Sequence, residues 1–103
     1  MSEINVSGKT IQLTDDGYMV DSSQWDKDVA QALAQAEGFE LTDDHFKVLE
    51  YLRQEYEAGN ALTIRKVGKS GIVDIKGLYN LFPGGPLKFS SKFAGIPKPT
   101  SCV

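Results

Sequence analysis

Apolar and polar residues alternate along the first twenty positions of the chain. Apolar side chains recur at every second position on both sides of a Ser-Gly pair, which is typical of a β-hairpin: Ile4, Val6, Ile11 and Leu13. The stretch "TDDG" then supplies a second turn, and "YMV" predicts a short third strand. We therefore expect a small antiparallel β-meander over residues 1–20.

The pattern then changes from period two to helical spacing. In "SSQWDKDVAQALAQAEGF", Ser23 precedes Asp26 by three residues, which resembles a capping box, and Gly38 supplies a stop. Apolar residues lie at helical spacing between these signals: Trp25, Val29, Leu33 and Ala36. The pattern predicts a helix over 24–37.

A longer amphipathic segment, "LTDDHFKVLEYLRQEYEAGN", predicts the second helix. Thr42 is a good N-cap, and Asp43 and Asp44 favour the positive end of a helix. The expected apolar stripe consists of Phe46, Leu49, Leu52 and Tyr56. Gly59-Asn60 ends the pattern.

Three shorter helical patterns follow. The first holds Ile64 and Val67, and the second holds Ile72, Ile75, Leu78, Tyr79 and Phe82. Gly68 and Gly71 separate these two, and Pro83 stops the second. The stretch "PLKFSSKFAG" predicts a last short helix, with Pro86 in its first turn and Gly95 at its end.

The remaining residues, "IPKPTSCV", predict an extended arm that could reach roughly 25 Å. With 103 residues and 41% apolar side chains, the chain has the size and composition of one domain. We expect an α+β fold: a β-meander (1–20) packed on a helical array (24–94), with a mobile C-terminal arm (95–103).

Composition excludes several classes of site. A single cysteine excludes an internal disulfide and any multi-cysteine metal centre, and the single histidine, His45, has no partner at zinc-ligand spacing. We expect no metal and no cofactor. The sequence has no apolar run of about 20 residues and no signal-peptide pattern at its start, so we expect a cytoplasmic protein whose thiol stays reduced, without a membrane partner.

Charge is distributed unevenly along the chain. Residues 1–59 hold four basic and thirteen acidic side chains, whereas residues 60–103 hold seven basic ones and a single acidic one, Asp74. A charge run is usually a solvated face, but the basic half could also face an anionic partner. It surrounds the tail that carries the cysteine.

Cys102 stands one residue from the end, after two prolines that prevent the tail from joining a helix or a central strand. Sulfur transfer needs a thiolate, and an ordinary cysteine is only a few per cent thiolate at neutral pH. Lys92 or Lys98 would raise that fraction if the arm folded back. Cys102 is therefore a candidate sulfur-bearing residue, and an incidental tail cysteine is the alternative.

Three other patterns have weaker functional interpretations. The segment "TIRKVGKSGIVDIKGLYNLF" could be a helix-turn-helix with Lys76 facing phosphate, although generic helical packing explains the pattern equally well. "FPGGP" lacks the Gly-Lys-Ser/Thr ending of a phosphate loop and indicates a rigid turn. His45 would act as a base only beside a nucleophile, and the one plausible nucleophile lies on the mobile arm, so we interpret His45 as structural.

The tail sequence resembles a known family. "LFPGGPLKFSSKFAGIPKPTSCV" is similar to the pattern LFPxGPxKxACxxAGLPKPTGCV of the DsrC/TusE family, small sulfur-relay proteins that include the gamma subunit of dissimilatory sulfite reductase. The matching residues are Leu81, Phe82, Pro83, Gly85, Pro86, Lys88, Ala94, Gly95, Pro97, Lys98, Pro99, Thr100, Cys102 and Val103. The resemblance continues upstream in "DDGYMVDSSQW", in Arg65, and in "LTDDHFKVLEYLRQEY", where Phe46 replaces a usual tryptophan.

This resemblance implies a β-meander on a helical bundle with a mobile arm, and it implies that Cys102 bears the sulfur. One position departs from the family pattern. DsrC proteins proper carry a second cysteine on the arm, whereas this chain has Ser91 there. A hydroxyl cannot form the disulfide or trisulfide that couples two cysteines in the sulfite reductase cycle. The single penultimate cysteine is instead similar to TusE, which passes persulfide toward tRNA 2-thiolation.

The leading hypothesis is therefore a sulfur carrier, a sulfurtransferase-type relay protein rather than a stand-alone enzyme. Its expected partners are sulfur-donor and sulfur-acceptor proteins, with dissimilatory sulfite reductase as a further candidate, and with steering by Arg65, Lys88, Lys92 and Lys98. The alternatives are an accessory or regulatory subunit of that reductase and a helix-turn-helix DNA-binding regulator. We expect no nucleic-acid partner under the leading hypothesis.

Overall fold

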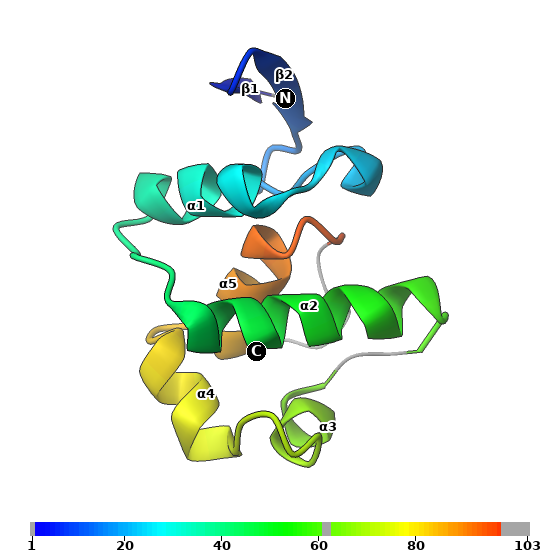
Figure 1. Cartoon of the computed structure of the whole chain (residues 1–103), viewed down its shortest axis with the longest axis vertical. Helices are drawn as coiled ribbons and strands as arrows, with labels where there is room; N and C mark the ends of the chain where they lie inside the picture. The colour runs from blue at the N-terminus through cyan, green and yellow to red at the C-terminus, as the bar shows by residue number, and fades with distance from the viewer. Residues whose placement is uncertain (1, 61–62, 98–103) are drawn as a thin grey trace.

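The computed structural model describes residues 2–60 and 63–97 and has the expected α+β architecture. Figure 1 shows the hairpin at one end of the long axis, α3 and α4 at the other, and α5 in the middle. The elements in chain order are β1 (Ser2–Val6), β2 (Lys9–Leu13), the 3₁₀ turn η1 (Ser22–Gln24), α1 (Lys27–Ala36), α2 (Asp43–Glu57), α3 (Ile64–Gly68), α4 (Ile75–Leu81) and α5 (Pro86–Phe93). Within these described ranges, no helix is long and apolar enough to cross a membrane.

The predicted hairpin is confirmed. β1 and β2 pair antiparallel with Val6 opposite Lys9, so the connection consists of Ser7 and Gly8 alone. Both have positive φ, 51° and 82°, as a two-residue type I′ turn requires. Ile11 is fully buried, because the alternation turns it toward the core.

The predicted third strand is wrong. Only an isolated bridge between Leu13 and Met19 joins "YMV" to the hairpin, so the described sheet has two strands. The segment is cut short because Asp21 already caps η1, its carboxylate accepting from the backbone N–H of Ser23 at 3.0 Å. Tyr18 and Met19 are nevertheless buried, as an inward-facing strand would have been.

α1 begins later than predicted, at Lys27 rather than at residue 24. Its N-cap is Asp26, whose carboxylate accepts from the N–H of Val29 at 2.9 Å, and not Ser23. The preceding residues form η1 instead, with Trp25 in an extended conformation at its end. The predicted stop at Gly38 is confirmed by its φ of 81°.

α2 has the predicted N-cap, Thr42, and the predicted end before Gly59. Its buried face differs from the predicted stripe: it consists of His45, Val48, Leu49 and Leu52. Tyr56 is 42% exposed and Phe46 is only half-buried. The face is rotated because α2 packs against α5, and the last turn of α2 extends beyond that contact.

α3 and α4 confirm the two short helical patterns, and the side chains of Thr63 and Asp74 cap them. Leu78 and Phe82 are fully buried as predicted. Other apolar residues of the second pattern are exposed by more than two fifths of their surface: Ile72, Ile75 and Tyr79. Two helices of five and seven residues are too short to cover one another completely.

α5 is the central helix, with Pro86 at its first position as predicted. It packs against α1, α2 and α4, and most of its residues are buried. Phe89 and Phe93 on α5 contact the ring of Phe39, with centroid distances of 5.0 and 5.2 Å. This aromatic cluster explains why an eight-residue helix is held firmly at the middle of the fold.

Candidate functional site

The tail that carries the candidate cysteine leaves from the end of α5. Cys102 and Lys98 lie outside the described residues, so the site is built from the part of the tail that precedes them. Ile96 is only 2% exposed, and its N–H donates to the carbonyl of Ser91 at 3.3 Å. The residues predicted to begin the mobile arm are therefore packed against the domain up to Ile96.

Arg53 of α2 holds the start of this tail. Its Nη1 donates to the carbonyl of Ala94 at 2.9 Å, and its Nη2 donates to the carbonyl of Ser22 at 3.1 Å. The carboxylate of Glu57 lies 3.8 Å away. Burial lowers the pKa of the Arg53 guanidinium, while Glu57 opposes that shift, and an arginine stays charged at neutral pH.

Trp25 holds the neighbouring carbonyl. Its indole Nε1 donates to the carbonyl of Phe93 at 2.7 Å, and its ring lies 4.6 Å from the guanidinium carbon of Arg53. Two consecutive carbonyls at the end of α5 are therefore bound by side chains from other elements. We call Trp25, Arg53 and the carbonyls of Phe93 and Ala94 the tail anchor.

Gly95 follows the tail anchor with a φ of +73°. A Cβ there would lie 2.6 Å from Cδ1 of Trp25 and 2.7 Å from the sulfur of Met19. Both the backbone conformation and the close approach require glycine at this position. The direction in which the chain leaves α5 is thus fixed by local packing.

Ser91, which replaces the second cysteine of the family pattern, lies inside the protein. It is fully buried, and its hydroxyl has no hydrogen-bond partner among the described residues. The adjacent Ser90 is equally buried, but its hydroxyl donates to the carbonyl of Leu87 at 3.2 Å. A buried hydroxyl without a partner costs free energy, whereas the thiol of a cysteine is weakly polar and tolerates such surroundings.

Lys92 is not the exposed steering residue that we expected. Its side chain is 9% exposed, and its Nζ lies 3.2 Å from a carboxylate oxygen of Glu37 at the end of α1. The same Nζ lies 5.6 Å from the ring centre of Tyr18. Burial, helped by the charge of Asp16, raises the pKa of the Tyr18 phenol. Lys92 therefore connects α5 to the segments around it.

Arg65 and Lys88 are exposed, as expected of steering residues. The structure does not bring them together: Arg65 lies on α3 and Lys88 on α5, which are separated along the long axis in Figure 1. Lys88 also lies over the ring of Phe89 at 5.7 Å. Of the predicted cations, these two remain candidates within the described residues.

His45 supports the structural interpretation. Its Nδ1 accepts from the backbone N–H of Thr42 at 3.1 Å, and its Nε2 lies 2.8 Å from the carbonyl of Leu81. The second contact requires the proton on Nε2, which donates to that carbonyl. His45 thus closes the first turn of α2 and connects it to the end of α4.

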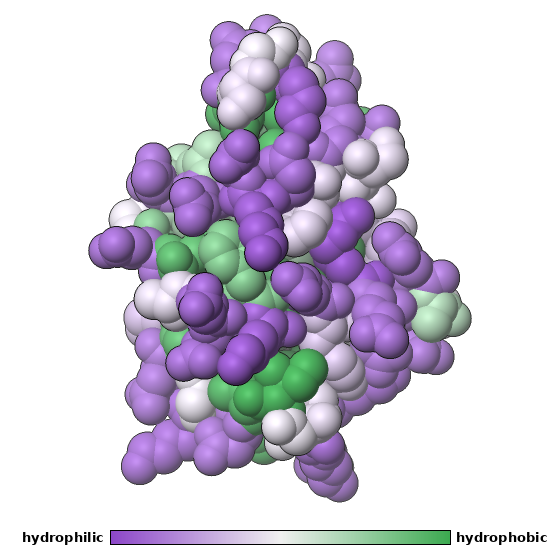
Figure 2. Space-filling view, in the orientation of Figure 1, coloured by the Kyte–Doolittle hydropathy of each residue, from purple (hydrophilic) through white to green (hydrophobic). Residues whose placement is uncertain are grey.

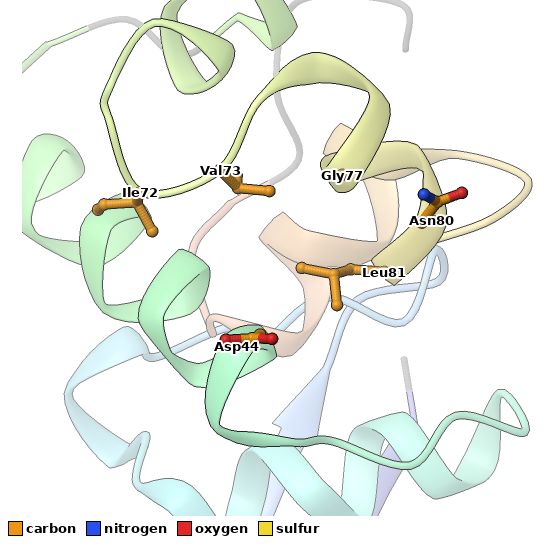
Figure 3. Close-up of a pocket in the computed structure, with 6 residues that line it drawn as sticks. All are labelled: Asp44, Ile72, Val73, Gly77, Asn80 and Leu81. Atoms are coloured by element: carbon orange, nitrogen blue, oxygen red, sulfur yellow. The ribbon is translucent and has the colours of Figure 1, made fainter.

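A pocket of about 310 Å³ lies between α4 and the start of α2 (Figure 3). Its lining consists of Asp44, Ile72, Val73, Gly77, Asn80 and Leu81, none of which is a predicted site residue. Figure 2 shows apolar surface in this α3–α4 region, where Ile72, Ile75 and Tyr79 are exposed. The pocket is therefore separate from the tail anchor.

Sequence reasoning missed the tail anchor. Trp25 was assigned to the apolar stripe of a helix, and Arg53 received no role. One signal was available, because Arg53 stands four residues after Leu49 and so lies at the edge of the buried face of α2. A charged residue at such a position needs partners within the fold.

The chain matches the family model described as "DsrC like protein" over residues 5–103. It is 39% identical over 108 residues to "Sulfurtransferase TusE homolog" of Haemophilus influenzae, covering 97% of this chain and 99% of the relative. It is 33% identical over 105 residues to "Sulfite reductase, dissimilatory-type subunit gamma" of Nitratidesulfovibrio vulgaris, with both chains fully covered.

Solved structures agree with these matches. The oxidised gamma subunit of dissimilatory sulfite reductase (DsrC) from Archaeoglobus fulgidus superposes with a TM-score of 0.84 at 37% identity, covering 99% of this chain and all of the other. DsrC of Allochromatium vinosum gives a TM-score of 0.83 at 37% identity, covering 98% and 97%. With the family model spanning nearly all of its length, this chain belongs to the DsrC-like family.

Proposed function

We propose that this protein is a sulfur carrier that accepts sulfane sulfur as a persulfide on Cys102 and delivers it to another protein. The observation that carries this proposal is full-length similarity to a protein named as a sulfurtransferase, in a chain whose single cysteine stands on the tail. The tail anchor supports it, because a fixed starting point lets a short arm present its thiol to a partner. We place the start of the arm after Ile96.

The proposed transfer needs no external oxidant or reductant. The Cys102 thiolate attacks the outer sulfur of a donor persulfide, and a new sulfur–sulfur bond forms. The bond within the donor persulfide breaks, and the donor leaves as a thiolate with the electron pair. The proton of the donor's terminal S–H stays with the transferred sulfur. Delivery repeats the exchange, with Cys102 as the leaving thiolate.

Ser91 favours a relay over a two-thiol reductive cycle. With one cysteine in the chain, an internal disulfide cannot form. This favours transfer of one sulfur at a time between proteins, as in a pathway of tRNA thiolation. The second candidate is an accessory subunit associated with dissimilatory sulfite reductase, and similarity to a protein named as its gamma subunit favours it.

The proposed partners are a donor sulfurtransferase and an acceptor protein, both in the cytoplasm. Arg65, Lys88 and Lys98 are the proposed steering cations, since positive charge on the surface accelerates encounter with an acidic partner. Lys92 is no longer among them, because it is buried and paired with Glu37. We propose no nucleic-acid partner.

Peptide mapping after transfer tests this assignment. The protein is incubated with a persulfidated donor sulfurtransferase, alkylated, and digested with trypsin, which cuts after Lys92 but not at the Lys98-Pro99 bond. We expect one additional sulfur on the peptide 93–103, which contains Cys102. No additional sulfur on that peptide, with a donor that loads its own partners, would contradict the proposal.

A further inference from the structure

We propose that Arg53 and Trp25 are positioning residues for sulfur transfer, which fix the point and direction from which the arm presents Cys102. This inference rests on the proposed function. Neither residue lies on the tail itself: Arg53 comes from α2 and Trp25 from the end of η1. Both donate hydrogen bonds to carbonyls at the end of α5, those of Phe93 and Ala94, which precede the arm by a few residues.

The end of α5 explains why two outside donors are needed. The N–H groups of Gly95 and Ile96 donate to the carbonyls of Lys92 and Ser91, which leaves the next two carbonyls without a donor from the helix. Trp25 and Arg53 supply those donors. Each bond therefore acts on the backbone at the end of α5, from which the arm departs, rather than on a side chain.

The two donors form one unit. The guanidinium of Arg53 also donates to the carbonyl of Ser22, which lies in the turn that ends at Trp25. Its guanidinium carbon lies over the indole ring, 4.6 Å from the ring centre, so each side chain limits the movement of the other. A Cβ at Gly95 would lie 2.6 Å from Cδ1 of the same indole, so the ring also packs closely on the chain that leaves α5.

Chain length sets how far the thiol can travel from this point. Cys102 is six residues beyond Ile96, which permits at most about 20 Å of reach. If the anchor released the chain back to Phe93, nine residues would intervene and the limit would rise to about 30 Å. The thiol would then sample a volume roughly three times larger, with no preferred direction, and its effective concentration at a docked partner's sulfur would fall.

Transfer between two proteins depends on that direction. The thiolate must approach along the sulfur–sulfur bond of the donor, and misplacement by about 1 Å can slow such a reaction by two orders of magnitude. A small persulfide in solution diffuses to the thiol wherever the arm points. The anchor should therefore matter for a protein donor and not for a small one.

Two conservative variants weaken the anchor. Trp25→Phe keeps an aromatic ring under the guanidinium but removes the N–H, and Arg53→Lys keeps the positive charge but loses the fork that binds two carbonyls. Glu57→Gln is the matched control, because it changes the exposed ion pair of Arg53 without touching the carbonyls. Val67→Ala controls for lost stability, because it opens a cavity at the one buried side chain of α3.

The first measurement compares two sulfur sources at a temperature where every variant is folded. With a saturating persulfidated donor protein, we expect Trp25→Phe and Arg53→Lys to accept sulfur roughly tenfold more slowly than wild type. With glutathione persulfide, all variants should load at the wild-type rate. Both controls should match wild type with either source. Equal rates for anchor variants and wild type with the protein donor would overturn the proposal.

A second measurement tests whether the tail anchor directs the arm, without any sulfur chemistry. A nitroxide label on Cys102, the single cysteine, broadens the NMR signals of backbone amides near it. In wild type and Glu57→Gln we expect the broadening to fall on one limited region, and in the anchor variants to spread over more of the surface. The same pattern of broadening in wild type, Glu57→Gln and both anchor variants would overturn the inference. Failure of wild type to load from either source would instead remove the proposed function.

Discussion

Two neighbouring serines of α5 differ in their hydrogen bonding. Ser90 and Ser91 are both fully buried, but among the residues that the structure describes only the hydroxyl of Ser90 has a hydrogen-bond partner, the carbonyl of Leu87. Burying a hydroxyl without a partner costs desolvation free energy that no hydrogen bond offsets. A buried hydroxyl with a partner contributes about 1 kcal/mol to the free energy of unfolding. Ser91 stands where the family pattern has a cysteine, whose thiol would tolerate these surroundings better.

Replacing these serines should have opposite effects. Ser91→Ala should raise the free energy of unfolding by about 1 kcal/mol, because it removes an unsatisfied polar group. Ser90→Ala should lower it by a similar amount, because it removes a bonded one. Thermal unfolding checks both, with expected shifts of the midpoint of roughly 4–8 °C in each direction. A lower midpoint for Ser91→Ala would mean that its hydroxyl has a stabilising partner.

The two lysines of α5 should also differ. Lys92→Glu places a carboxylate in a buried site beside Glu37 and should cost about 2–3 kcal/mol of unfolding free energy. Lys88→Glu changes an exposed side chain and should stay within about 0.5 kcal/mol of wild type. Urea denaturation measures both. Equal stability of the two variants would show that the burial and pairing of Lys92 contribute little to the free energy of unfolding.

At the scale of elements, sequence pattern predicted most helices and turns correctly. The Ser7-Gly8 turn, the Thr42 cap and the Pro86 start all depend on local chemistry, which the sequence states directly. The two errors in the helices have different causes. Local capping by Asp21 formed η1 and displaced the expected start of α1, whereas packing against α5 rotated the buried face of α2 away from Tyr56.

The corrected start of α1 makes a prediction about pH. A hydrogen bond from Lys9, followed by one from the N–H of Val29, lowers the pKa of the Asp26 carboxyl. A lowered folded pKa gives stability that is present above the unfolded value of about 3.9 and is lost as pH falls through the folded value. Asp26→Asn lacks that charge. At pH 7 its free energy of unfolding should therefore be lower than that of wild type, and this difference should shrink as the pH falls below about 4.

Thermal unfolding of Asp26→Asn and wild type from pH 7 to pH 2 measures this convergence. Asp28→Asn is the matched control, because Asp28 is an acidic residue in the same first turn that does not serve as the cap. A difference between wild type and Asp26→Asn that stays constant over the whole range would show that the charge of Asp26 contributes nothing to folding.

At the scale of the whole molecule, the sequence predicted the fold class and the family, but not the site around the tail. The tail motif consists of residues that are consecutive in the chain, so the sequence alone was enough to identify it. The tail anchor joins residues 25, 53 and 94, which are far apart in the chain, and no spacing rule connects them. The burial of Lys92 depends likewise on Glu37, 55 residues away.

The proposed function depends on sulfur being carried by one residue, Cys102. Intact mass spectrometry of the protein after incubation with a persulfidated donor tests this most directly. Wild type should gain one sulfur, about 32 Da, and lose it again when an acceptor thiol is added, by the exchange described above. Cys102→Ser should gain none. Equal gains by wild type and Cys102→Ser, or no gain by wild type, would contradict the account.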